Sequence, residues 1–171
     1  MGVNRRQLAL RLRPLLTNGE GAGNMPQLVN TKRILVPVGG NSVDEEVIRL
    51  ACNLAKKPKA QVYVVYIIEV ERSLPLDAQV DSETKKAEAV LGNAEDIAAE
   101  EHCEIETDLL QAREAGPGIV DEAMERGVDL IIMGIGYKRH LGAFDLGKTA
   151  PYVLKEAPCH VLLYRGHASL E

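Results

Sequence analysis

The chain has 171 residues, of which 46% are hydrophobic and 26% are charged, and these values suit one compact domain with a sizeable core. No run of about 18 or more apolar residues occurs, so we expect a soluble, cytoplasmic protein that does not span a membrane. The net charge of the chain is −5. Residues 1–30 contribute +3, from four arginines and one glutamate, so the remaining residues carry −8. This acidic remainder argues against a nucleic-acid-binding protein.

The first thirty residues are expected to form a flexible basic tail outside the fold. Arg5–Leu16 mixes arginines with leucines, and the stretch that follows is small, polar and turn-forming. A basic amphipathic helix on an anionic membrane is the alternative, which the usual behaviour of chain termini disfavours. We therefore divide the chain into a tail at 1–30, a domain at 31–166 and a C-terminal tail at 167–171.

From Thr31 onward, short apolar segments alternate with longer amphipathic ones, which predicts βαβ units and an open, five-stranded parallel sheet with helices on both faces. The strands are expected at Arg33–Val38, Gln61–Ile68, Glu104–Leu110, Asp129–Met133 and His160–Tyr164. Four helices are expected at about Ser42–Lys56, Ser82–Glu101, Gly116–Gly127 and Lys148–Glu156.

The first helix has a capping-box pattern, because Ser42 is followed three residues later by Glu45. Its helical spacing predicts one buried face. That face comprises Val47, Ile48, Ala51 and Leu54.

Two loops follow strands at the edge where an open parallel sheet binds its ligands. One is Gly39–Asn41, after the first strand, and the other is Gly134–Leu146, after the fourth. Because right-handed crossovers place neighbouring strand ends on one rim, these loops are able to share a ligand. Gly147, Lys148 and Thr149 then open a helix, whose free N–H groups and positive dipole end favour an anion.

The string from Gly142 to Thr149 also fits the Walker A pattern of P-loop NTPases. In a P-loop, however, the first glycine follows its strand almost at once, whereas the expected strand here ends nine residues before Gly142. The last strand, His160–Tyr164, carries no acidic magnesium ligand. A P-loop NTPase is therefore the least favoured interpretation.

Three segments together resemble the universal stress protein family: ILVPV at Ile34–Val38, VDLIIMG at Val128–Gly134 and APCHV at Ala157–Val161. The resemblance covers Lys32–Arg165 with the motifs in order. It implies a Rossmann-like fold of the adenine nucleotide alpha hydrolase type, with strand order 3-2-1-4-5. It also implies a stress-response or regulatory role, a homodimer that pairs through His160–Tyr164 and, in one branch of the family, bound ATP, accompanied by Mg²⁺, or AMP.

The glycine pattern of the nucleotide-binding branch is kept in length but not in every letter. Gly134 and Gly147 match its outer glycines, while its middle glycine is Tyr137 here and its hydroxyl position is Lys148, followed by Thr149. The aspartate that ends the family's first strand is Gly39. The resemblance and the rim argument give these expected nucleotide-binding residues: Pro37, Val38, Gly39, Ile67, Met133, Gly134, Gly136, Tyr137, Lys138, Gly147, Lys148 and Thr149.

Two interpretations stay open, an adenine-nucleotide cleft with an altered pose and a ligand-free dimeric interaction protein of the same fold. No nucleophile, base and orienting group are placed together by a motif, so we expect no enzyme and name no catalytic residue. The three cysteines have no metal-ligand spacing, and no metal site is predicted. If a nucleotide were to bring a metal, Asp145, in the loop after the fourth strand, is the nearby carboxylate that we would name as its ligand.

Overall fold

A computed structural model of the chain describes residues 31–78, 81–136, 139–140 and 143–166. Its strands are β1 (Arg33–Val38), β2 (Gln61–Glu69), β3 (Ile105–Ala112), β4 (Leu130–Ile135), β5 (Arg139–His140), β6 (Ala143–Phe144) and β7 (His160–Arg165). Its helices are α2 (Asp44–Lys56), α3 (Asp81–Glu100), α4 (Ala115–Arg126) and α5 (Thr149–Glu156).

The main sheet has five parallel strands in the order β3-β2-β1-β4-β7, which confirms the expected fold and strand order. β1 lies in the middle and pairs with β2 from Arg33 opposite Gln61 to Val38 opposite Tyr66. On its other side β1 pairs with β4, through Ile34 opposite Leu130. The strand order reverses at β1, so the carboxyl ends of β1 and β4 form the expected ligand-binding rim.

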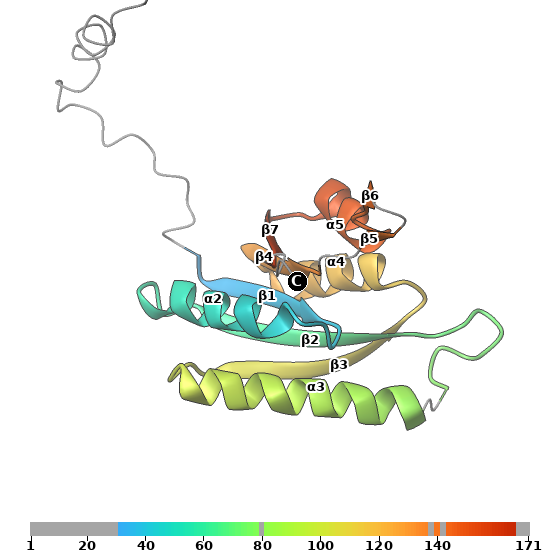
Figure 1. Cartoon of the computed structure of the whole chain (residues 1–171), viewed down its shortest axis with the longest axis horizontal. Coiled ribbons are helices and arrows are strands. Elements are labelled where there is room, and N and C mark those ends of the chain that lie inside the picture. The colour runs from blue at the N-terminus through green and yellow to red at the C-terminus, as the bar shows by residue number, and fades with distance from the viewer. Residues whose placement is uncertain (1–30, 79–80, 137–138, 141–142, 167–171) are drawn as a thin grey trace, which may run out of the picture.

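Helices cover both faces of the sheet, with α2 and α3 on one side and α4 and α5 on the other (Figure 1). Alternate residues of β1 therefore enter different cores, because side chains alternate across a strand. Ile34 and Val36 are buried against α2 and α3, whereas Leu35 is buried against α4 and α5. Burial on both faces explains why the central strands are almost continuously apolar.

The connection from β2 to α3 is fixed beside the sheet. The Arg113 guanidinium donates to the carbonyls of Val70 at 3.3 Å and Leu74 at 2.9 Å, and the Gln111 amide donates to the carbonyl of Ala78 at 2.8 Å. These bonds fasten the described part of the connection to the end of β3.

Two expectations for α2 were wrong. The helix begins at Asp44, and neither Ser42 nor Glu45 caps it through a side-chain hydrogen bond. Leu54 is 40% exposed, because the buried face of α2 is completed by Cys52 and Ala55 instead.

The loop after β4 contains a short antiparallel hairpin, β5–β6, that the sequence did not predict. β6 lies inside the Walker A string, so this stretch is partly paired strand and does not wrap directly into a helix as a P-loop does.

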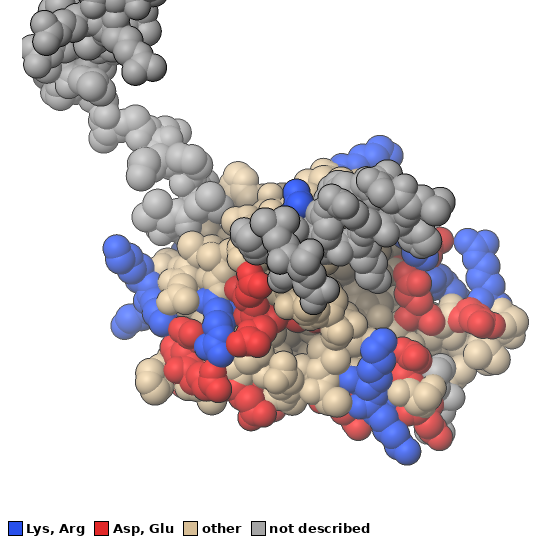
Figure 2. All heavy atoms as spheres, viewed as in Figure 1, with Lys and Arg blue, Asp and Glu red and all other residues tan. Residues whose placement is uncertain are grey.

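Acidic and basic side chains are interspersed on the face of the molecule seen in Figure 2, without a large patch of one sign. None of the helices in the described part of the chain is long and apolar enough to cross a membrane.

Candidate functional site

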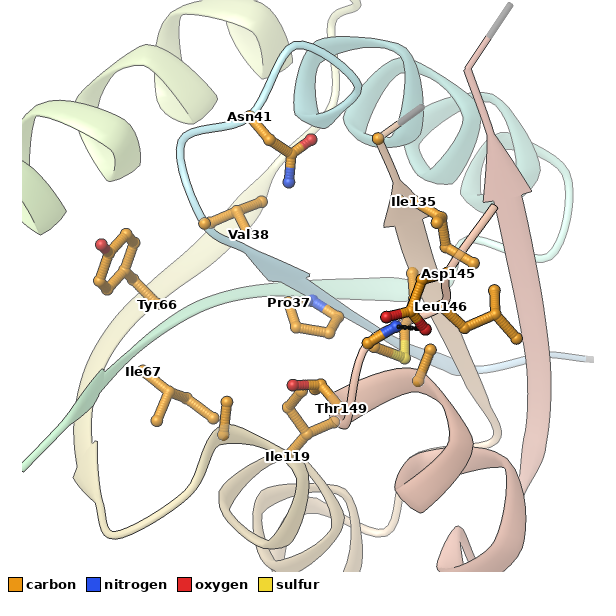
Figure 3. Close-up of a pocket in the computed structure, with 17 residues that line it drawn as sticks. Pro37, Val38, Asn41, Tyr66, Ile67, Ile119, Ile135, Asp145, Leu146 and Thr149 are labelled. Carbon is orange, nitrogen blue, oxygen red and sulfur yellow. Dashed lines mark hydrogen bonds between the residues drawn. The ribbon is translucent and has the colours of Figure 1, made fainter. Parts of the chain in front are cut away.

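A cavity of about 460 Å³ lies at the carboxyl ends of β1 and β4, and it also reaches the end of β2 and the starts of α4 and α5. Its volume is within the range usual for small-molecule sites. Figure 3 shows Ile67 on one side, and Ile135, Asp145 and Leu146 on the other, while the ring of Tyr66 is turned away from the cavity. Tyr66 is buried in the core beneath α2 and α3. The apolar side chains of Ile67, Ile135 and Leu146 thus form opposite walls, which suits a flat, weakly polar group.

The sequence-predicted residues fall into three groups. Those that line the cavity are Pro37, Val38, Gly39, Ile67, Met133, Gly134, Gly136, Gly147 and Thr149. Lys148 does not line it and lies at its rim, where its ammonium is paired with Glu69. Tyr137 and Lys138 lie outside the described residues.

Other lining residues are absent from the expected nucleotide-binding set. Asn41 and Leu146 lie in the two loops that were expected at the rim, whereas Tyr66, Ala115 and Ile119 come from the end of β2 and the start of α4. Ala115 and Ile119 belong to α4, which is not part of either glycine-rich loop, so the loop motifs do not predict them. The topology does predict that α4 begins at this rim, since right-handed crossovers place the start of each helix at the edge where the preceding strand ends.

The β1 loop is organised by Asp44. One of its carboxylate oxygens, Oδ2, accepts the N–H groups of Gly39 at 3.0 Å, Gly40 at 2.7 Å and Asn41 at 3.1 Å. Asp44 is only 7% exposed, and this burial raises the pKa of its carboxyl, against the hydrogen bonds, which lower it. The N–H groups of this loop are therefore already used by the fold.

The entrance to α5 is more open. Gly147 adopts the left-handed conformation with φ +67°, and its N–H donates to Asp145 Oδ1 at 2.9 Å, the contact drawn dashed in Figure 3. Asp145, Gly147 and Lys148 are all exposed. The helix start at Lys148 has no side-chain cap, so its first N–H groups are available to an anion.

Glu69 connects three of the elements around the cavity. It ends β2, its carboxylate accepts the N–H of Ala115 at the start of α4 at 2.8 Å, and it lies 3.3 Å from the Lys148 ammonium at the α5 entrance. Both partners are distant from Glu69 in sequence, so no local pattern predicts this placement.

The two glycines at the end of β4 have different reasons to be glycine. A Cβ on Gly134 would lie 3.0 Å from a methyl group of Val47, so this residue lets α2 approach the sheet closely. A Cβ on Gly136 would have no described atom within 4 Å. The first glycine therefore has a packing role, while the second leaves open space at the cavity.

Among the described residues, no cluster of three or more His, Cys, Asp or Glu side chains is arranged to hold a metal ion. Asp145 does line the cavity, as its place in the loop suggested.

Comparison with known proteins agrees with the fold and the motifs. The model of the universal stress protein family matches residues 30–165. A universal stress protein of Methanocaldococcus jannaschii is 34% identical over 140 residues, which are 78% of this chain and 82% of that protein.

Solved structures show the same likeness. A universal stress protein from Archaeoglobus fulgidus superposes with a TM-score of 0.66 at 28% identity, over 77% of this chain and 97% of that one. A universal stress protein from the same organism, solved in complex with dAMP, gives a TM-score of 0.63 at 26% identity, over 78% of this chain and 98% of that one. With its sheet order, its strand motifs and a family match over most of its length, this chain belongs to the universal stress protein family.

Proposed function

We propose that the cavity at the ends of β1 and β4 binds an adenine nucleotide, and that the chain acts as a ligand-responsive regulatory protein. The observation that carries the proposal is the position of the cavity, which joins apolar walls to the start of α5 at the reversal point of the sheet. The Archaeoglobus fulgidus relative that was solved with dAMP supports this choice of ligand class.

The lining residues fit the parts of such a ligand. Val38, Ile67 and Met133 offer apolar surface to a base. Asn41 and Thr149 place an amide and a hydroxyl at the cavity, where they can fix the orientation of a sugar or phosphate. The free N–H groups at the start of α5 suit a phosphate. The proposal is one of binding, without a chemical step.

A first experiment asks what the protein carries. The purified protein is denatured, and the released small molecules are identified by mass spectrometry, with isothermal titration of AMP into the emptied protein alongside. We expect an adenine nucleotide to be released or to bind. A protein that is empty and shows no heat of binding at millimolar AMP would refute the proposal.

A steric variant then locates the site. Gly136→Leu places a side chain in the open space at the cavity, and we expect the affinity for AMP to fall by about tenfold or more, because the added group occupies ligand space. Gly92→Leu is the matched control, because a Cβ on Gly92, in α3, also meets no atom within 4 Å but lies away from the cavity. Equal affinities in the two variants would place the ligand elsewhere.

We also propose that two copies pair through β7. This strand ends the sheet, and its side chains Val161, Leu162, Leu163 and Tyr164 are only partly buried. His160 and Gly166 donate their N–H groups toward the β4 side, so alternation turns the N–H groups of Val161 and Leu163 toward the open edge. An open edge of this kind is a template for pairing with another strand.

Val161→Pro removes one of the outward N–H groups while leaving the β4 ladder intact. We expect this variant to be monomeric by light scattering, whereas Val161→Ala, which keeps the N–H group, stays dimeric. A monomeric wild type, or a dimeric Val161→Pro protein, would contradict pairing through this edge. This interface is equally compatible with a ligand-free interaction protein, which is the second candidate if the cavity proves empty.

A further inference from the structure

Beside the free N–H groups of α5, two further donors that a phosphate would use at this entrance are occupied by carboxylates. The Gly147 N–H is bonded to Asp145 at 2.9 Å, and the Lys148 ammonium lies 3.3 Å from Glu69. A loop N–H and an ammonium beside a helix start are the usual donors to phosphate oxygens. In this chain each of these two donors already has an anionic partner.

The two carboxylates are held at the cavity and beside it. Asp145 lines the cavity, whereas Glu69 is not a lining residue and stands at the rim, next to Lys148. Glu69 is anchored by the N–H of Ala115, which also lines the cavity, so the carboxylate cannot swing away without giving up that bond. The Glu69 and Lys148 side chains are 40% and 67% exposed, so their ion pair contributes little to folding. Its larger effect is on the charge that an entering ligand meets.

The two negative charges oppose additional phosphate groups, because like charges at short range repel and because each phosphate oxygen has to displace a carboxylate from its donor. A base and ribose meet no such opposition, since the apolar surface offered by residues such as Val38 and Ile67 is independent of the α5 entrance. The penalty therefore rises with the number of phosphates on the ligand.

We propose that Asp145 and Glu69 determine the ligand class of this chain, which is adenosine or an adenine monophosphate rather than a nucleoside triphosphate. This selectivity rests on the proposed nucleotide site. The length of the glycine-rich loop alone suggests the branch of the family that binds ATP or AMP. The selectivity against ATP arises because this chain keeps that length but has a carboxylate, Asp145, two residues before Gly147.

The test compares adenosine, AMP and ATP by isothermal titration without added magnesium. We expect the wild type to bind AMP at least about tenfold more tightly than ATP. In the double variant Asp145→Asn with Glu69→Gln, the affinity for ATP relative to adenosine should rise by about tenfold. Asn and Gln keep an oxygen acceptor for the N–H groups of Gly147 and Ala115, so the variant changes charge more than hydrogen bonding.

Glu71→Gln is the control for a general change of charge, because Glu71 is exposed, lies two residues beyond Glu69 and accepts from Ser73, whereas Glu69 pairs with Lys148. It should alter the ratio of ATP to adenosine affinity by less than about twofold. The selectivity proposal is overturned if the wild type binds ATP as tightly as AMP, or if the double variant leaves the ratio unchanged. Absence of binding by all three compounds would instead remove the proposed nucleotide site, and the selectivity with it.

Discussion

The β1 loop and the α5 entrance lie at the same rim and use the same device, a carboxylate that accepts backbone N–H groups. In the β1 loop, buried Asp44 accepts three N–H groups and ties the loop to the first turn of α2. At the α5 entrance, exposed Asp145 accepts a single N–H group from its own loop. The first arrangement is buried within the fold, while the second is exposed at the proposed nucleotide site. Burial, rather than residue type, separates the two arrangements.

Removing each carboxylate in turn tests whether the two loops contribute differently to the stability of the fold. We expect Asp44→Ala to lower the free energy of unfolding by about 2 kcal/mol, because three loop N–H groups lose a charged acceptor. Asp145→Ala should change it by less than about 0.5 kcal/mol, since its hydrogen bond is exposed to water. Urea denaturation measures both values. Similar losses in the two variants would mean that the α5 entrance is also part of the structural framework.

A second effect concerns ligand charge. Lys148→Glu places a third carboxylate beside Glu69 and Asp145 at the α5 entrance, so we expect the affinity for AMP to fall by about tenfold relative to adenosine. Titration calorimetry with both compounds gives this ratio. An unchanged ratio would show that the phosphate does not approach the start of α5.

The smallest expected effect is on how the stability of the fold depends on pH. Burial raises the pKa of Asp44 above its ordinary value of 3.8, so the folded chain holds this proton more tightly than the unfolded chain. The resulting stabilisation is complete below pH 3.8 and is lost as the pH rises through the raised pKa. The stability of the wild type relative to Asp44→Asn should therefore fall as the pH rises above 3.8, as measured by urea denaturation over a series of pH values. A relative stability that rises over this range would mean that the hydrogen bonds to Asp44 outweigh its burial.

The sequence was a good guide to the strands, because each apolar segment is long enough to show its period, whereas the strand order was implied by the resemblance to the universal stress protein family. It was a poor guide to the cap of α2. Ser42 and Glu45 match the capping-box pattern but do not form its hydrogen bonds, and the acceptor that orders the loop is Asp44. The β5–β6 hairpin was missed because strands of two residues have no measurable period.

For the candidate site, the loops after β1 and β4 were identified through their glycines, and many of their residues do line the cavity. Their role in binding stays a prediction. The contact between Glu69 and Lys148 could not be predicted from the sequence, because 79 residues separate the two. The packing of α4 against α5 brings them together. Long-range polar pairs of this kind carry no local signal.

The two outer strands of the sheet differ in a way that limits assembly. On β3, Glu106 and Asp108 are engaged by Arg126, which also lies over the ring of Tyr63, so this edge carries charge. On β7, partly buried apolar side chains line the strand. A sheet that attracted copies at both ends would grow into a filament, whereas one receptive end and one charged end allow growth to stop at two chains. In a dimer paired through β7, as proposed above, the ion pairs of Arg126 on β3 would keep the opposite edge from adding further copies, and they also hold α4 on the sheet.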